Sequence, residues 1–445
     1  RGGVSKMVKQ LSLELADHSS AWNAAGLADE WFSRVYEDAL PPPMLEAVQA
    51  SFAHLEPAVV TTQSGGSSEH TWWMPLDAAP RSAIEAAVLH LYRVAFREGA
   101  AHSVVGAEWW MRDQEPTARM NFHFDKDESH AASHNAIRSP EVGTVTYLSA
   151  AGSPTLVLNQ TLGCGVGDVD HLAQRRPVPS WNLPVGFGAD AMEPPTARAA
   201  LLQFPHENVH AVFRGNLHHG VVGELASGAA GRRKVLLINW WRAPAPTGAL
   251  CVRPDAAHWR GIGLLLGSGQ AAALVGGPTT HRAGAPTRLL VSEEVPRQTV
   301  RWIGFEVGDG HLYHYAFPTA VTRSSAGSWA VRWARGAMGP LTALDRRNFQ
   351  PLMEEARPKL FLVTEGGPRQ TSQNTPRRRW VGALPPWLSE LHDACAASLR
   401  LVLVEPSDAA FLRHFGLTRD DAPTAVLHDT HADRRRLLGE RLSEA

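Results

Sequence analysis

An imidazole and a carboxylate lie two residues apart at His123 and Asp125, inside the partly apolar run 120–127. In a β-strand, side chains two residues apart point to the same face, so both groups can bind one metal ion. Together with a more distant histidine they would form a 2-His-1-carboxylate triad, whose open coordination positions suit Fe(II) and O2 chemistry. The spacing therefore predicts a non-haem iron site.

The same spacing recurs at His431 and Asp433, in different surroundings. The residues that follow, 434–438, have the composition of a helix. Helical residues two positions apart point about 200° away from each other, so this second pair is not expected to bind one metal ion. Of the two pairs, only His123 and Asp125 lie in a segment whose sequence predicts a strand.

The residues after Asp125 predict further strands around such a site. Alternation over 144–148 indicates a strand, Gly152–Pro154 a turn and 155–158 a returning strand. Much later, a glycine turn delivers His219 into a new strand. This histidine is the candidate for the distal ligand.

Three consecutive cations, Arg232, Arg233 and Lys234, lead into the continuous apolar run 235–241. A run of this kind is typical of a buried strand. A cation at the start of such a strand can neutralise a carboxylate deep inside a barrel.

In this order, the parts resemble the Fe(II)/2-oxoglutarate-dependent dioxygenases, particularly the prolyl-hydroxylase-like branch. That family has His-x-Asp, a tyrosine-leucine strand and a glycine turn, then a distal His and a basic residue that begins a Trp-ending strand. The likeness covers residues 100–245. It implies a double-stranded β-helix, or jelly-roll, fold in which His123, Asp125 and His219 hold iron.

The resemblance also implies a cosubstrate site. Tyr147 and a basic residue would bind the far carboxylate of 2-oxoglutarate, and counting back along the family's strand favours Lys234. Arg233 is the alternative and would face the opposite side of the strand. His219 is favoured over His218 as the distal ligand, because of its place before the glycine.

The activity that the resemblance implies is hydroxylation of an unactivated C–H bond, with Fe(II), 2-oxoglutarate, O2 and ascorbate as cofactors or cosubstrates. A peptidyl side chain is the expected substrate, because the branch includes prolyl hydroxylases. A net charge of −1 gives no general attraction to nucleic acid. We expect no nucleic-acid partner.

A rival metal motif, His-Glu-x-x-His, occurs at His206, Glu207 and His210. On a helix it would place both imidazoles on one face for zinc, with the glutamate as general base of a metallopeptidase. The β-branched and aromatic residues that follow favour a strand instead. The expected structure is a loop entering a strand.

The chain has 445 residues, of which 44% are hydrophobic, enough for two or three domains. Its longest apolar region, 261–277, is interrupted by glycines and polar residues, so we expect no membrane span. We expect a soluble protein, in the cytoplasm or in the lumen of the secretory pathway.

Helical periodicity over Met44–Leu55 and Arg81–Glu98 predicts two helices ahead of the barrel strands, where they would brace the sheet. The long gap before His219 indicates an insertion around Gly163–Thr196. The expected division of the chain is an oxygenase domain over 1–260, with its core at 100–245, a linker over 261–285, and a strand-rich connector with a second domain over 286–445.

The C-terminal part alternates strands with helices, which predicts a small α/β unit. The predicted elements are strands at 359–363, 399–404 and 424–427 and helices at 385–397 and 407–415. Residues 346–445 resemble a thioredoxin-like domain, with Pro423 at its cis-proline position. Because Cys-x-x-Cys is missing, the likeness is to the non-catalytic, polypeptide-binding or spacer modules of protein disulfide isomerases. An inactive scaffold built on this module is the alternative to an enzyme.

Overall fold

The computed structural model describes a little less than half of the chain. The described residues are 25, 27, 32–52, 71–96, 103–134, 137–162, 192–194, 197–226, 230–246, 290–292, 300–307, 311–318, 321, 326–333, 342–343, 359–363, 400–404, 409–415, 417, 424–429 and 434–438. The expected linker, the expected helix at 385–397 and most of the expected insertion lie outside these ranges. No helix within them is long and apolar enough to cross a membrane.

Six antiparallel strands form the first sheet. Its order is β1 (Ser33–Tyr36), β10 (Val209–Arg214), β5 (Val142–Tyr147), β12 (Arg233–Arg242), β3 (Val104–Gln114) and β2 (Trp72–Pro75). The apolar run after Lys234 lies in β12 between β5 and β3, and it is buried on both faces. A central strand with two covered faces explains why this run does not alternate between apolar and polar residues.

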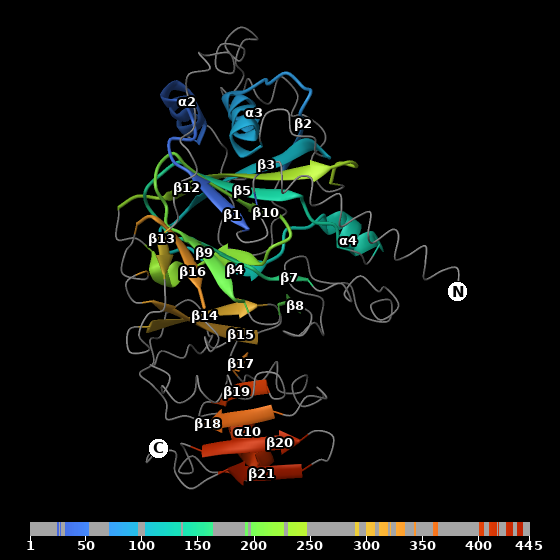
Figure 1. Ribbon diagram of the computed structural model, residues 1–445, viewed down its shortest axis with the longest axis vertical. Helices are drawn as coiled ribbons and strands as arrows, with labels where there is room; N and C mark the ends of the chain where they lie inside the picture. Colours follow the sequence, from blue (N-terminus) through green and yellow to red (C-terminus); the bar gives the residue numbers. More distant parts are fainter. Residues whose placement is uncertain are drawn as a thin grey trace, which may run out of the picture.

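Helices α2 (Pro42–Phe52) and α3 (Ala83–Ala95) cover one face of the first sheet (Figure 1). They confirm the two predicted helices. Leu236, Ile238 and Trp240 of β12 are fully buried in the core on this side. Burial of each such side chain stabilises the fold by about 1.5–3 kcal/mol.

The second sheet lies against the other face of the first. Its order is β13 (Leu290–Ser292), β16 (Ser328–Arg332), β9 (Ala199–Gln203), β6 (Thr155–Leu158), β11 (His219–Val221), β4 (Met120–His123), β14 (Val300–Val307) and β15 (His311–Pro318). Its pairs are antiparallel except β13 with β16 and β14 with β4. Two packed, mainly antiparallel sheets agree with the expected jelly roll at that level of detail.

Two features of this sheet differ from expectation. The turn at Gly152–Pro154 does not close a hairpin, because β5 belongs to the first sheet and β6 to the second. Strands β13 and β16 join the second sheet through the β16–β9 pair, and β14 and β15 join it through the β14–β4 pair, whereas the sequence placed residues 286–340 in a connector outside the oxygenase core. The sequence pattern shows strands but does not show their partners.

Side chains from both sheets form an apolar interior between them. Its buried members include Val35, Val145, Tyr147, Val157, Leu201, Val235 and Leu237. The described part of the chain adds three short elements around this core: α4 (Glu128–His134), the 3-10 helix η4 (Gly223–Leu225), and the strand pair β7 (Thr161–Leu162) and β8 (Met192–Glu193).

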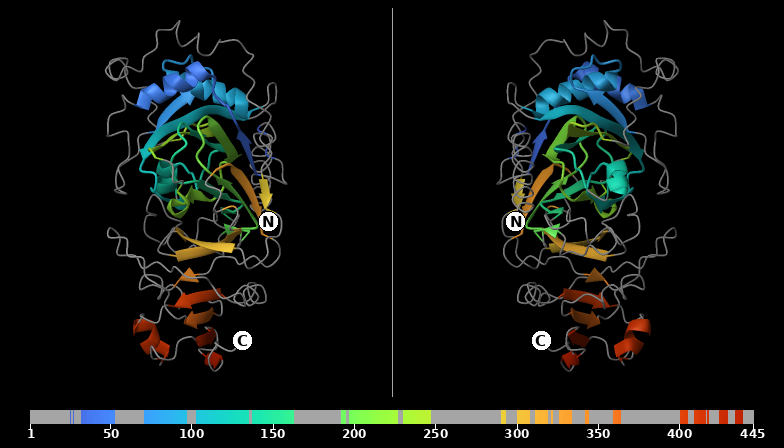
Figure 2. Two further views of the ribbon diagram at one scale, coloured as in Figure 1. Left: turned by 90° about the vertical axis from the view of Figure 1, so that its left-hand side faces the viewer. Right: turned by 90° about the vertical axis from the view of Figure 1, so that its right-hand side faces the viewer.

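A third sheet lies at the far end of the molecule from α2 and α3 (Figure 2). Its order is β17 (Thr342–Ala343), β19 (Arg400–Val404), β18 (Lys359–Val363), β20 (Thr424–Asp429) and β21 (Arg434–Leu438), and α10 (Ala409–Phe415) precedes β20. The first three strands are parallel and the last two are antiparallel. This mixed sheet confirms the predicted strands and the predicted helix near 407–415.

The expectation of a helix at 434–438 is wrong. These residues form β21, which pairs with β20 in the register Val426↔Leu437 and Asp429↔Arg434. Arginine and leucine favour helices, but five residues are too few for a stable helix, and the hydrogen bonds to β20 decide the structure.

Candidate metal centre

His123 and His219 face each other across two neighbouring strands. In the antiparallel pair of β4 and β11, the two histidines are direct partners, and their ring centroids lie 4.5 Å apart. Phe122, one residue earlier on β4, points to the opposite side and is buried in the outer core of the second sheet. Alternation along β4 therefore turns His123 toward the interior between the sheets.

Asp125 completes the group although it lies beyond the end of β4, rather than in the strand as the sequence suggested. Its Oδ1 lies 3.4 Å from His123 Nε2, and its Oδ2 lies 3.6 Å from His219 Nε2. One ligand atom of each residue lies within 4.8 Å of the others. The structure thus brings together the three residues that the sequence singled out.

The charges of this group suit a metal ion. Burial alone would raise the pKa of Asp125, but His219, His123 and a hydrogen bond with Asn239 outweigh it and hold the pKa well below its usual range. Burial lowers the pKa of His219 to about 4 against the attraction of Asp125. A carboxylate and a neutral imidazole are the forms in which these residues bind metals.

A backbone carbonyl orients His219. The carbonyl oxygen of Leu217 lies 2.8 Å from His219 Nδ1. This contact assigns the proton to Nδ1, which donates to the carbonyl, and leaves the lone pair on Nε2 for a ligand. An outer hydrogen bond of this kind is the usual partner of a metal-binding histidine.

The donor set of two imidazoles and one carboxylate fits a non-haem Fe(II) ion and leaves coordination positions open. Asn239, which supports Asp125, was missed in the sequence. Asn239 is a polar side chain within the apolar run of β12, and a polar residue at such a position could have been predicted to have a buried hydrogen-bond partner.

Arg233 lies in the same interior, on the face of β12 that also carries Val235 and Leu237. It is 2% exposed. Its Nε donates to the Ser153 carbonyl at 3.0 Å, its Nη1 to Gln114 Oε1 at 3.1 Å, and its Nη2 to Thr155 Oγ1 at 3.0 Å. Within the described residues, these acceptors are all neutral, and no carboxylate pairs with this guanidinium. A buried cation without a counter-ion favours an anionic ligand.

Lys234, which the sequence analysis favoured, points the other way. Alternation places it on the face of β12 that α2 and α3 cover, where it lines a surface pocket of about 280 Å³ with Ser149 and Glu207. The alternative, Arg233, is the cation that faces the metal-site side.

Tyr147 lies beside Arg233. Its hydroxyl donates to Thr155 Oγ1 at 2.6 Å, and the Arg233 guanidinium lies over its ring at 5.5 Å from the centroid. Burial raises the pKa of Tyr147 against the attraction of Arg233, so the phenol keeps its proton. Thr155, which contacts both residues, had no distinguishing signal in the sequence.

The His-Glu-x-x-His segment is not a helix. His206 and Glu207 lie in an exposed turn, Asn208 has a φ of 63°, and His210 is a buried residue of β10. His210 Nδ1 lies 2.9 Å from Thr146 Oγ1. The loop-to-strand expectation is confirmed, and the helical zinc geometry that a metallopeptidase needs is absent here.

No protein-family model matches the sequence, and no curated protein matches it either. Similar solved structures include a Pseudomonas putida prolyl-4-hydroxylase, with 14% identity, a TM-score of 0.29 and coverage of 50% of this chain and 95% of that chain. EctD from S. alaskensis, with 2-oxoglutarate and 5-hydroxyectoine, has 15% identity, a TM-score of 0.28 and coverage of 48% and 74%. HygX from Streptomyces hygroscopicus, with iron bound, has 11% identity, a TM-score of 0.24 and coverage of 47% and 82%. The function is therefore argued from the site itself.

Proposed function

We propose that this protein is an Fe(II)- and 2-oxoglutarate-dependent dioxygenase that hydroxylates an unactivated C–H bond. The observation that carries the proposal is that a metal-ligand set and a buried cation both lie in the interior between the two sheets. His123, Asp125 and His219 form a three-residue ligand set, and Arg233 offers a buried cation without a carboxylate partner among the described residues.

The register of the second sheet sets the spacing of these two groups. His219 pairs with Val157 on β6, and Thr155, which accepts from Arg233, lies two residues further along the same strand. Two residues of a strand span roughly 7 Å. A five-carbon dicarboxylate such as 2-oxoglutarate suits this span, with its keto-acid end at the metal and its far carboxylate on the guanidinium.

Iron and 2-oxoglutarate bound here would supply the oxidising chemistry, with O2 as oxidant and succinate and CO2 as co-products. The chain's own residues would bind and orient the cosubstrate and shield it from water. Arg233 fixes the far carboxylate with a planar set of donors, and Tyr147 and Thr155 hold the guanidinium in place. Val157, Val235 and Leu237 make the wall between the two ends apolar, which excludes water.

The substrate in this proposal is a peptidyl side chain, and the C-terminal unit is a thioredoxin-like module that holds polypeptide. The family resemblance motivates both statements. The mixed sheet of β17 to β21, with three parallel strands followed by two antiparallel ones, supports the α/β character of that module.

Formation of succinate from 2-oxoglutarate tests the activity. Purified protein with Fe(II), O2 and ascorbate should release succinate, and His123→Ala should abolish the release. A wild-type protein that neither binds Fe(II) nor forms succinate would favour the inactive scaffold instead.

A Glu207→Gln variant tests the zinc-peptidase alternative separately. The exposed turn position of Glu207 predicts unchanged succinate formation and no peptidase activity to lose. Glu207-dependent peptide hydrolysis in the wild type would restore that alternative.

A further inference from the structure

A partly buried carboxyl group lies beside the metal centre, on the strand next to β12. Glu108 of β3 pairs with Asn239 of β12, so the two side chains share one face of the first sheet. Asn239 makes a hydrogen bond with Asp125. Cross-strand neighbours have Cβ atoms roughly 4.5–5.5 Å apart, which places Glu108 one strand spacing from the residue that supports the metal ligand.

Glu108 lies on the opposite side of the metal centre from the proposed cosubstrate site. Arg233 is at the start of β12, whereas Asn239 and Trp241 are near its end, and a strand spans roughly 20 Å between Arg233 and Asn239. If 2-oxoglutarate extends from the metal toward Arg233, the side that carries Glu108 remains for the molecule to be hydroxylated.

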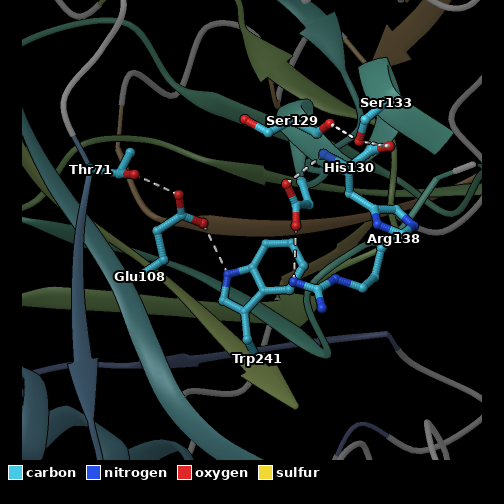
Figure 3. A network of polar contacts seen from close by, with 8 residues as sticks. Thr71, Glu108, Ser129, His130, Ser133, Arg138 and Trp241 are labelled. Atoms are coloured by element: carbon cyan, nitrogen blue, oxygen red, sulfur yellow. Dashed lines mark hydrogen bonds and ion pairs between the residues drawn. The ribbon is translucent and has the colours of Figure 1, made fainter. Parts of the chain in front are cut away.

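The partners of Glu108 are neutral. Thr71 Oγ1 donates to its Oε1 at 2.6 Å, and the Trp241 indole Nε1 donates to its Oε2 at 3.0 Å (Figure 3). A carboxylate has about four lone-pair sites, so these two hydrogen bonds leave about two sites for a ligand. Within the described residues, no cation forms an ion pair with this carboxyl group.

Arg138 contacts this network but is paired with another carboxylate. Arg138 lies over the Trp241 ring at 5.3 Å from its centroid, and its Nη2 contacts Asp127 Oδ2 at 3.0 Å. Asp127 also accepts from the backbone N–H of His130, which fixes the start of α4. Arg138 therefore neutralises the charge of Asp127 and contacts Trp241, whereas no described cation neutralises the charge of Glu108.

Burial raises the pKa of Glu108 to about 7, because the carboxylate loses hydration that its two neutral donors only partly replace. A bound cation would restore the ionised form. Desolvated charges are stable in proteins when an opposite charge and hydrogen bonds accompany them.

We propose that Glu108 determines substrate specificity by binding a cationic nitrogen, an ammonium or guanidinium group, of the molecule that is hydroxylated. The inference rests on the proposed dioxygenase function and specifies its substrate class. Two sources supply this chemistry: a free amine-bearing small molecule, or a lysine or arginine side chain of a polypeptide. The residue is assigned to binding and not to the chemical step.

Stimulation of succinate formation by matched probes tests the assignment. Free lysine and arginine are compared with their neutral counterparts, norleucine and citrulline, and each of the four is also presented inside a blocked tripeptide. The free and peptide arms distinguish the two sources. We expect wild-type protein to prefer the cationic member of a pair, and the preference to fall roughly tenfold or more in Glu108→Gln, as the loss of a charged hydrogen bond implies.

Glu115→Gln is the matched control, because it removes a carboxylate from the exposed turn just after β3. It should keep the wild-type preference. In Glu108→Lys the preference should turn toward glutamate, a gain that misfolding does not produce. Probe binding measured by calorimetry gives a second readout for every variant.

The outcomes separate this inference from the function on which it rests. Succinate formation with equal stimulation by cationic and neutral probes, or an unchanged preference in Glu108→Gln, would overturn the role of Glu108 alone. Binding of cationic probes that depends on Glu108, without succinate formation in any condition, would overturn the dioxygenase function and leave a cation-binding site.

Discussion

His123 and His219 are direct partners across the antiparallel strands β4 and β11, with ring centroids 4.5 Å apart. A sheet fixes the separation of cross-strand partners more firmly than a loop does. The two imidazoles are thus held in place by the backbone hydrogen bonds of the sheet before any ion binds, and Asp125 approaches both from the segment that follows β4.

Removal of His219 should therefore abolish tight binding of Fe(II). The loss should exceed the roughly 10–100-fold change that follows from removing only an outer hydrogen bond to a ligand. Anaerobic titration of His219→Ala with Fe(II) measures it. His206→Ala, at an exposed position of the rival motif, is the matched control and should bind Fe(II) like the wild type. Loss of binding in the control alone would place the metal elsewhere.

Arg233→Lys should raise the KM for 2-oxoglutarate roughly tenfold or more, because a lysine keeps the charge but loses the planar donors. Lys234→Gln should leave this KM unchanged, since Lys234 lies on the other face of β12. Steady-state kinetics with both variants decide between the two cations. A higher KM in Lys234→Gln with a normal KM in Arg233→Lys would reverse the assignment.

The residues of the candidate metal site could be selected from the sequence because the His-x-Asp spacing is a local signal. The strand that this spacing predicted ends at His123, and Asp125 reaches the same group from the segment beyond β4. The distal His219 was also identifiable from its glycine turn. Their meeting point depends on the β4–β11 register, which is a long-range pairing that no local pattern encodes.

Features that depend on the partner strand were predicted incorrectly or missed. The preference for Arg233 over Lys234 depends on which face of β12 meets the second sheet, and the pairing Val235↔Tyr147 puts the Arg233 side chain on the face that Tyr147 shares. A shift of one residue exchanges the faces. Likewise, β21 is a strand because β20 is beside it, although its residues favour a helix.

His210 should make the fold sensitive to acid. Burial, together with the nearby His90, lowers the pKa of His210 to about 3, whereas an unfolded histidine titrates near 6.5. Between these values the unfolded state binds more protons, so the free energy of unfolding falls as the pH decreases, by up to about 1.4 kcal/mol per pH unit. Urea unfolding from pH 7 to pH 4 measures this slope.

A variant without the titrating ring isolates that contribution. His210→Gln should flatten the slope between pH 6.5 and pH 4, and it can still form a hydrogen bond near Thr146. His206→Gln removes an exposed histidine from the same segment and should keep the wild-type slope. Equal slopes in all three proteins would show that His210 does not control acid unfolding.

Gly152 should control the position of Arg233. Its φ is +118°, and an added Cβ would lie 2.5 Å from Arg233 Cβ. Gly231 has a nearly equal φ of +120°, but its added Cβ would meet only Ala151 Cβ, at an ordinary 3.5 Å. Alanine at either position should cost roughly 1–3 kcal/mol of stability through backbone strain.

Only Gly152→Ala should also raise the KM for 2-oxoglutarate, because the clash displaces the guanidinium that we propose binds its far carboxylate. The comparison with Gly231→Ala removes the shared effect of strain, and denaturation curves verify that the two variants lose similar stability. Equal KM values in the two variants would mean that Arg233 tolerates the displacement or does not contact the cosubstrate. A selective rise in Gly152→Ala would connect the strained turn between β5 and β6 directly to cosubstrate binding.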